Sequence, residues 1–306
     1  MELINTENGL KAVVELDEVE INWWRKEIGK IRKRLIPSPK ESVSEFFENN
    51  FDHIGRKVDV ENISELIQEI REGVWGSFVN REIDFFRETV NLLVHDRDAP
   101  KEVLDSLLHD QIGKEIIAAT SYDQLVQPLL KFYSESTGRL FPYFYELSKS
   151  QTNSRRSRAG AEFEEIIDQI MRRLEIPYDS QAQLGQKTFS DEGLGKKVDG
   201  VVPSMESYNK SRSRCIIATM KTSIRERWQE VVEELNRTNI PSIHLLTLDD
   251  TITANTLELM NNHNMTLVTY KFVKDRHPTF NNIMDFETFF GTEIPHTLEW
   301  WRQNII

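Results

Sequence analysis

Two short segments decide the fold: Lys197-Val-Asp-Gly-Val-Val202 and Cys215-Ile-Ile-Ala-Thr-Met220, the second followed directly by Lys221. Short runs rich in Val, Ile and Thr are typical of β-strands. Their spacing suits two neighbouring strands of a hairpin, which would bring Asp199, at a bend before Gly200, next to Lys221 at the end of the second strand. The sequence therefore predicts a carboxylate and an ammonium group side by side at the end of a strand pair.

The chain continues with alternating strand and helix patterns after this pair. Strand-like runs occur at residues 243–248 and 265–270, and helical spacing of apolar residues marks residues 224–236 and 254–262. Such alternation predicts an α/β core in which helices cover at least the last strands of the sheet. Another helix is expected upstream, over residues 161–174.

The first half of the chain is predicted to be helical, with apolar residues at helical spacing from Ile63 to Val74. Residues 148–160 are rich in Ser, Asn and Arg, a composition typical of a linker or loop. We therefore expect two parts: residues 1–150 as a helical part that contacts DNA and mediates dimerisation, and residues 151–306 as a catalytic and recognition core.

The composition is that of a soluble globular protein, with 39% hydrophobic and 29% charged residues among 306. The single cysteine fits a reducing cytoplasm, and neither a signal peptide nor a membrane span is evident. The net charge of −12 counts against a nucleic-acid-binding protein. Residues 21–36 and 148–160 are nevertheless locally basic, so the overall charge does not exclude one.

Hydrolysis of a phosphodiester needs a hard cation held by carboxylates, an activated water and groups that stabilise negative charge. Asp199 is the expected metal ligand, and Lys221 is expected to contact the phosphate and the attacking water. In the commonest nuclease site of this kind a second acid lies two residues before the lysine, where this chain has Thr219. Glu234, on the following helix, is the expected substitute.

The triplet Arg225-Glu226-Arg227 is suited to reading bases in the major groove. Arginine pairs bidentately with guanine, and glutamate accepts from the amino group of cytosine. Charged helix starts are also common as solvated features, so the triplet alone leaves both interpretations open.

Taken together, Asp199, Lys221, the Arg225–Arg227 triplet and Glu234 resemble the CCGG/CCNGG branch of the PD-(D/E)xK type II restriction endonucleases, which includes EcoRII, SsoII, PspGI and NgoMIV. The segment from Arg155 through Glu164 also resembles the lead-in to the active site of these enzymes. The resemblance covers about residues 155–235, and the missing acid at Thr219 is characteristic of this branch.

The resemblance implies a restriction-endonuclease-like α/β core, a central mixed sheet flanked by helices, and Mg²⁺-dependent cleavage of double-stranded DNA at a palindromic CC(N)GG-type site before the first C, leaving 5′ overhangs. Flanked forms such as TCCNGGA remain open. It also implies a third metal ligand at Glu164, with Glu165 as the alternative, beside Asp199 and Glu234. The Arg225–Arg227 triplet would read CC·GG. Three arginines of the lead-in are assigned to phosphates: Arg155, Arg156 and Arg158.

The implied partners are double-stranded DNA, a second copy of the chain and a cognate DNA methyltransferase of the same restriction–modification system. Some members of this branch extrude the central nucleotides of the site into a pocket, which needs a flat side chain. Arg71 and Trp75 adjoin on one helix face and are candidates for it, although Trp75 as an aromatic at the edge of the core is an equal alternative. Two rival functions remain: a repair or mobile-element nuclease of the same superfamily, and a non-catalytic DNA-binding protein on a nuclease core.

Overall fold

The computed structural model describes residues 1–50, 58–225, 227–238 and 240–304, without the side chain of Arg227. The chain divides into two compact units. Residues 1–38 and 76–157 form one, called the helical unit below, and residues 39–75 and 158–306 form the other, called the sheet unit. The sequence analysis expected two parts that meet at residues 150/151. The division in the structure differs from it, because residues 39–75 belong to the sheet unit.

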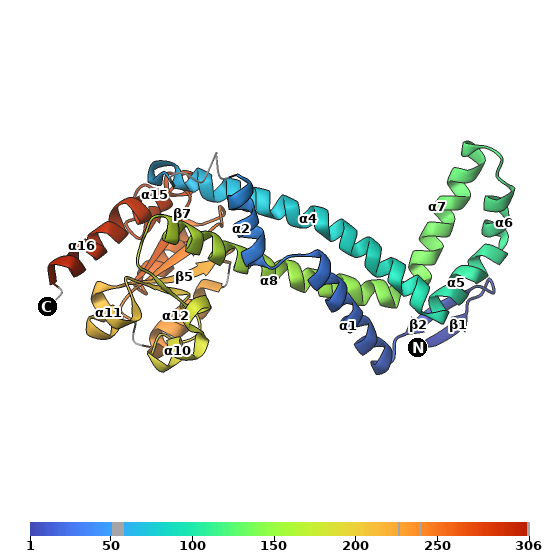
Figure 1. Ribbon diagram of the computed structural model, residues 1–306, viewed down its shortest axis with the longest axis horizontal. Helices are drawn as coiled ribbons and strands as arrows, with labels where there is room; N and C mark the ends of the chain where they lie inside the picture. Colours follow the sequence, from blue (N-terminus) through green and yellow to red (C-terminus); the bar gives the residue numbers. More distant parts are fainter. Residues whose placement is uncertain (51–57, 226, 239, 305–306) are drawn as a thin grey trace. The chain divides into compact units, whose positions relative to one another are not determined.

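The helical unit contains a β-hairpin that the sequence analysis did not predict, followed by helices (Figure 1). Its elements are β1 (Glu2–Asn5), β2 (Lys11–Glu15), α1 (Glu18–Leu35), α5 (Asp98–His109), α6 (Gln111–Ala118) and α7 (Tyr122–Arg139). Two long helices contribute residues to both units: α4 (Ile63–Asp96) and α8 (Phe141–Arg173).

The sheet unit holds the remaining elements. They are α2 (Pro39–Asn49), η1 (Val60–Asn62), β3 (Asp179–Ser180), α9 (Gln181–Leu184), α10 (Gln186–Asp191), β4 (Gly200–Val202), α11 (Met205–Lys210), η2 (Arg212–Arg214), β5 (Ile216–Lys221), α12 (Arg227–Thr238), β6 (Ile243–Thr247), α13 (Ala254–Asn261), β7 (Met265–Thr269), α14 (Lys271–Lys274), β8 (Ile283–Asp285), α15 (Phe286–Thr288), η3 (Phe289–Glu293) and α16 (Ile294–Asn304).

Within the described residues the sheet has six strands in the order β3-β4-β5-β6-β7-β8. The first two pairings are antiparallel and the last three are parallel. Successive side chains of a strand point to opposite faces, and both faces of this sheet are covered. One core joins the sheet to α4 and α8, and the other joins it to α12 and α13. The predicted α/β core with a mixed sheet is confirmed.

The prediction of a linker at residues 148–160 is wrong, because the whole segment lies inside α8. Its side chains are mostly polar, and several of them form ion pairs or hydrogen bonds in the folded chain, so the segment lacks apolar periodicity although it is helical. Arg155 binds Glu82 within the helical unit. Arg158 binds Glu162 within the sheet unit.

Two tryptophans and a histidine have packing roles. Trp24 is fully buried and its indole N–H donates to the Tyr143 carbonyl at 3.0 Å. Trp301 donates in the same way to the Arg214 carbonyl at 2.8 Å. His244 lies in β6, and burial lowers its pKa to about 4, so it is neutral at physiological pH. No helix in the described parts of the chain is both long enough and apolar enough to cross a bilayer.

Candidate active site

Asp199 and Lys221 meet at the end of the antiparallel pair β4–β5, as the strand pattern predicts. The backbone N–H of Asp199 donates to the Ala218 carbonyl at 2.9 Å, which extends the pairing by one residue. The carboxylate accepts from the Met220 N–H at 2.6 Å and from Lys221 Nζ at 3.2 Å. Thr219, where the commonest nuclease site has an acid, donates to the same oxygen at 3.2 Å. The hydroxyl therefore positions Asp199.

Gly200 follows Asp199 because there is no room for a side chain. A Cβ at this position would lie 2.1 Å from the ring of Tyr178. Tyr178 itself is partly buried, and desolvation of its phenol together with nearby carboxylates holds its pKa well above 10. The phenol is therefore a neutral hydrogen-bond donor or acceptor next to Asp199. No sequence pattern marked Tyr178, because it was recognisable only once β3 and β4 were paired.

Glu164 approaches this pair from α8. Burial raises its pKa to about 7, the negative charge of Asp199 adds to the rise, and Lys221 opposes it. Asp168 lies one helical turn further on the same face of α8, and burial raises its pKa as well. The sequence analysis missed Asp168, although the spacing of four residues from Glu164 was a visible signal. Glu165 instead accepts from Gln169 at 2.8 Å.

Glu234 lies in α12 and is 8% exposed. Its carboxylate accepts from the Lys196 N–H and from Arg237, each at 2.5 Å. A Cβ at Gly195, whose φ is +74°, would lie 1.7 Å from this carboxylate, so the turn requires glycine. Lys196 precedes Asp199 by three residues, which span at most about 10 Å. Glu234 thus binds the segment that leads into Asp199, and the contacts described for it are not with Asp199 or Lys221.

The predicted base-reading triplet begins in the loop between β5 and α12. Arg225 is exposed and has a φ of +30°, which is unusual for a residue with a side chain. The loop is held by Asp249, whose carboxylate accepts from the Ile224 N–H at 2.8 Å and binds Ser223. Glu226 and the side chain of Arg227 lie outside the described residues.

The three arginines assigned to phosphates differ in their surroundings. Arg155 is exposed but binds Glu82, and this hydrogen bond raises the pKa of Arg155. Arg156 is exposed. Arg158 is 7% exposed, forms an ion pair with Glu162 at 2.6 Å and donates to Ser42 at 2.6 Å. Arg158 therefore has a packing role in this structure, which leaves Arg156 as the arginine best placed to meet a phosphate.

Arg71 and Trp75, the candidates for an extrahelical nucleotide, lie one turn apart in α4. Arg71 lines a cavity of about 360 Å³ together with Arg225, Asp249 and Tyr270. Trp75 is half-buried, and the described lining of this cavity does not include it. The structure thus brings Arg71, rather than Trp75, next to the predicted base-reading loop.

A family model described as EcoRII C terminal matches residues 129–290, more than half of the chain. The chain belongs to the EcoRII C-terminal family. The type II restriction enzyme SsoII of Shigella sonnei is 29% identical over 275 residues, which are 89% of this chain and 82% of SsoII. The predicted membership of the CCGG/CCNGG branch of type II restriction endonucleases is confirmed. Such enzymes are generally dependent on a divalent metal ion.

Solved structures agree with this membership. A structure of metal-depleted Ecl18kI in complex with uncleaved, modified DNA matches with a TM-score of 0.69 and 27% identity, covering 94% of this chain and 86% of that one. A PspGI–substrate DNA complex matches with a TM-score of 0.53 and 18% identity, covering 87% and 94%. The second likeness shows the fold alone. The predicted restriction-endonuclease-like fold is confirmed.

Proposed function

We propose that this enzyme hydrolyses double-stranded DNA in a Mg²⁺-dependent reaction at a palindromic site with a CC(N)GG-type core. Cleavage before the first C of each strand would leave 5′ overhangs. The observation that carries the proposal is the cluster of Asp199, Lys221 and Glu164 at the end of β4–β5, with an arginine-bearing loop directly after β5. Carboxylates, an ammonium group and a base-reading loop are what sequence-specific phosphodiester hydrolysis requires.

The residues present fit a divalent cation. Two carboxylates, Asp199 and Glu164, lie close enough for one to raise the pKa of the other, and a cation between them would relieve this repulsion. No group of three or more potential metal ligands is gathered among the described side chains. Mg²⁺ often takes only one or two protein carboxylates, with waters and phosphate oxygens completing the shell. Glu234 is the proposed third ligand, which requires it to exchange its contact with Lys196.

When bound, the cation would lower the pKa of a coordinated water and stabilise charge on the phosphate. The protein residues prepare that site. Asp199 is fixed by the Met220 N–H, so its carboxylate is oriented before any ligand arrives. Lys221 is poised at 3.2 Å from Asp199, and its three N–H donors would contact a phosphate oxygen and the attacking water. Thr219 acts as a positioning residue for Asp199, and the ring of Tyr178 lies against the neighbouring Gly200.

Recognition of CC·GG is assigned to Arg225, Glu226 and Arg227. Replacing Arg225 by Ala is expected to cost ~1–3 kcal/mol of discrimination between a CC(N)GG duplex and a random duplex, because a bidentate contact to guanine is lost. Replacing Arg156 by Ala should instead weaken binding to both duplexes and reduce the slope of log affinity against log salt by about one. Competition binding at several salt concentrations measures both effects. An unchanged affinity ratio for Arg225→Ala would remove Arg225 from base reading.

Asp249 is expected to support specificity without touching DNA. Replacing it by Ala removes the carboxylate that holds the Ile224 N–H and Ser223, and a hydrogen bond to a charged group contributes ~1.5–3 kcal/mol. We expect the ratio of specific to random DNA affinity to fall by roughly tenfold, which corresponds to about 1.4 kcal/mol. Asp191→Ala, at an exposed aspartate that ends α10, is the control and should leave the ratio unchanged. Equal ratios for the two variants would contradict this role.

The DNA site could contain a central base pair between its CC and GG halves. Extruding the two nucleotides of that pair would allow the same arrangement of Arg225, Glu226 and Arg227 to read both CCGG and CCNGG. The cavity beside Arg71 supports such a role for its guanidinium, since it adjoins the reading loop. Trp75 remains a proposed stacking partner.

A palindromic site cut on both strands calls for two active sites related by a twofold axis, so we propose a homodimer. The proposed functional partner is a cognate methyltransferase of the same restriction–modification system, acting in the cytoplasm. The proposed role of residues 1–150 is contact with DNA and with the second subunit.

A further inference from the structure

The side chain of Tyr178 reaches the active site from the edge of the sheet. Tyr178 directly precedes β3, which pairs with β4 so that Ser180 lies opposite Gly200. In an antiparallel pair a long side chain also reaches its diagonal neighbour, two residues along the other strand. The ring of Tyr178 does so, because its hydroxyl oxygen would lie 2.2 Å from a Cβ on Gly200. The hydroxyl end of the ring is thus next to Asp199, whose charge acts on the phenol.

Three contacts fix the position of Tyr178. The Gln181 N–H donates to the Asp199 carbonyl at 2.8 Å, which continues the β3–β4 pairing as far as the active-site carboxylate. The Asp179 carboxylate accepts from the Met205 N–H at 2.7 Å. The ring itself packs against the core between the sheet and α8. The hydroxyl is therefore held in place before any substrate binds.

The protein leaves this hydroxyl open. It has no hydrogen-bond partner among the described residues, and the side chain is partly exposed, so a ligand can reach it. The carboxylate of Glu164, whose charge acts on the same phenol, likewise has no hydrogen bond within the part of the chain that the structure describes. Half-buried polar groups without partners need an explanation, and two of them in one cluster indicate a site prepared for a ligand.

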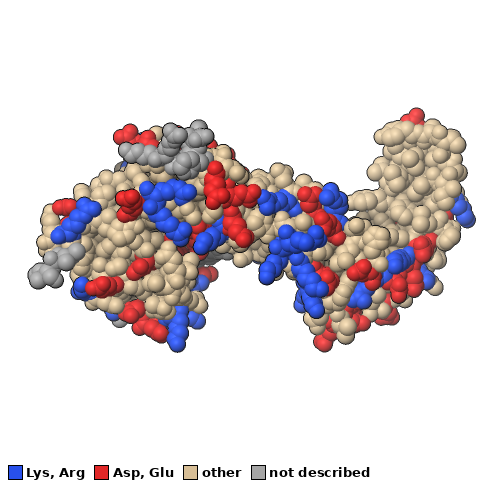
Figure 2. Space-filling view, in the orientation of Figure 1, with Lys and Arg blue, Asp and Glu red and all other residues tan. Residues whose placement is uncertain are grey.

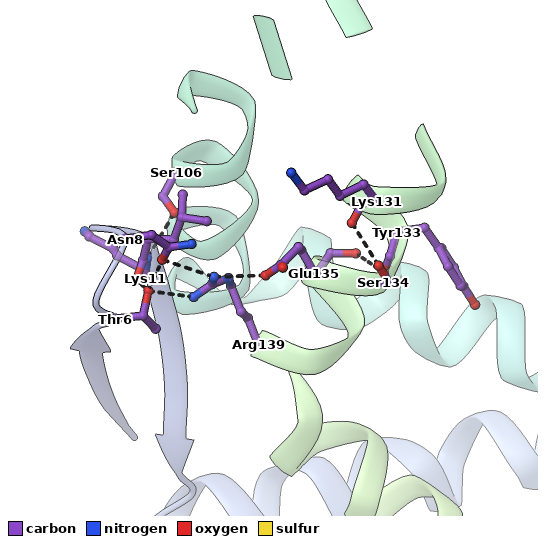
Figure 3. A network of polar contacts seen from close by, with 11 residues as sticks. Thr6, Asn8, Lys11, Ser106, Lys131, Tyr133, Ser134, Glu135 and Arg139 are labelled. Atoms are coloured by element: carbon purple, nitrogen blue, oxygen red, sulfur yellow. Dashed lines mark hydrogen bonds and ion pairs between the residues drawn. The ribbon is translucent and has the colours of Figure 1, made fainter. Parts of the chain in front are cut away.

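A polar cluster in the helical unit, by contrast, is held together by bonds among its own members (Figure 3). Arg139 donates to Glu135 at 2.9 Å and to Thr6 at 3.0 Å. Thr6 donates in turn to the Leu10 carbonyl at 3.0 Å. Side chains that only stabilise the fold bind one another in this way. The open hydroxyl of Tyr178 differs from them.

The charges around the hydroxyl determine what it binds. Desolvation and the carboxylates of Asp199, Asp168 and Glu164 hold the pKa of Tyr178 well above 10, so the phenol keeps its proton. Asp168 already accepts from Gln183 at 3.2 Å and pairs with Arg172. A protonated phenol offers one donor, and an acceptor oxygen with negative charge binds such a donor most strongly.

DNA brings oxygens of this kind to the end of β4–β5. On the face of the sheet unit in Figure 2, acidic and basic side chains are interspersed and form no continuous basic surface. The phosphate that is cleaved must therefore be held by individual donors and not by a general positive field. Two donors adjoin Asp199 on its own side of the pair: the ammonium group of Lys221 and the hydroxyl of Tyr178.

We propose that the Tyr178 hydroxyl is a catalytic group that donates a hydrogen bond to a nonbridging oxygen of the scissile phosphate. The tyrosine forms no covalent bond, and its proton stays on the phenol throughout. The nonbridging oxygens gain negative charge as the attacking water adds to phosphorus, so this hydrogen bond strengthens toward the transition state. The proposal rests on the active site of the proposed function and adds a phosphate contact to it.

Tyr178→Phe is the first test, because it removes the hydroxyl oxygen and keeps the ring that packs on Gly200. Single-turnover cleavage at saturating enzyme is expected to fall roughly 10²-fold, the loss typical of one donor to a developing oxyanion. Affinity for the same duplex in a chelator is expected to fall only about threefold, as for an ordinary hydrogen bond. Cleavage by Tyr178→Phe at the wild-type rate would overturn the proposal.

Tyr208→Phe is the matched control. The Tyr208 hydroxyl is buried in α11 and has no hydrogen-bond partner among the described residues, so its removal is the same chemical change away from the active site. This variant should cleave and bind DNA like the wild type. Urea unfolding should give both variants the free energy of unfolding of the wild type, since neither loses a hydrogen bond within the described chain.

The second test measures the contact without cleavage. Two duplexes, each with sulfur in place of one nonbridging oxygen of the scissile phosphate, compete with the unmodified duplex in a chelator. Sulfur is a weak acceptor, so the wild type should bind one of the two diastereomers about threefold more weakly than the unmodified duplex. Tyr178→Phe should bind that diastereomer and the unmodified duplex equally.

An oxygen preference that is the same in the wild type and in Tyr178→Phe would overturn the phosphate contact, even if the variant cleaves slowly. Failure of the proposed function is separate from this outcome. It would show as full cleavage by an Asp199 variant, whereas an inactive Asp199→Asn beside a fully active Tyr178→Phe would reject the tyrosine alone.

Discussion

Asp199→Asn is expected to reduce the rate of DNA cleavage on the order of 10³-fold or more, because it removes the negative charge that would hold the cation. Site-specific binding should change little, since Asp199 is not assigned to base reading. The substitution also removes the ion pair between Asp199 and Lys221 Nζ, which are 3.2 Å apart, so the ammonium group of Lys221 is held less firmly. Single-turnover cleavage of a duplex with one CC(N)GG site, alongside equilibrium binding to the same duplex, measures both quantities.

The control for this variant is Asp191→Asn, at an exposed aspartate that ends α10. It carries the same change of charge and should cleave like the wild type. Full activity of Asp199→Asn at the same Mg²⁺ concentration would show that the metal site lies elsewhere. Lys221→Met should also lose cleavage while keeping specific binding, since it removes the phosphate contact and not the reading loop.

Glu164→Gln is expected to abolish cleavage and yet to stabilise the metal-free protein. The pKa of Glu164 is raised from 4.5 to about 7 by burial and by Asp199. The folded state therefore holds this proton more tightly than the unfolded state does. The resulting stability is fully present below pH 4.5 and is lost as the pH rises through 7. At about 1.4 kcal/mol per pH unit, the ionised carboxylate costs the fold about 3 kcal/mol above pH 7.

Urea unfolding in the presence of a chelator at pH 5 and at pH 8.5 measures this cost. Glutamine is neutral at both values, so the variant should exceed the wild type in free energy of unfolding by about 2–3 kcal/mol at pH 8.5 and by little at pH 5. Adding Mg²⁺ in place of the chelator should stabilise the wild type, so the difference in free energy of unfolding between Glu164→Gln and the wild type should become smaller at pH 8.5. Glu165→Gln, one residue further along α8, should show neither the stabilisation nor the loss of cleavage. If Glu165→Gln were instead the stabilised and inactive variant, the role of metal ligand would belong to Glu165 and not to Glu164.

The centre of the site was predictable from sequence because it depends on local strand pairing. Asp199 and Lys221 lie at the ends of two apolar runs, and antiparallel pairing alone brings them together. The covering helices α12 and α13 were visible through their apolar periodicity, which burial on the sheet requires. These features are set by short stretches of sequence.

Features that depend on tertiary pairing were not predictable in the same way. The middle of α8 was interpreted as a linker because its side chains are polar, and only the folded chain supplies their partners, such as Glu82 for Arg155. Tyr178 lies next to Asp199 because β3 pairs with β4, a contact that its own sequence neighbourhood does not encode. Arg158 resembled a phosphate contact in sequence, and burial with Glu162 assigned it to packing.

The most direct test of the central claim is to digest phage DNA with the purified protein and Mg²⁺ and to sequence the fragment ends. The account predicts that every end begins at one short palindrome with a CC(N)GG-type core, that each 5′ overhang starts at the first C, and that a chelator or Asp199→Asn removes the ends. Fragment ends scattered over unrelated sequences, or ends at a defined site without the CC and GG halves, would contradict it.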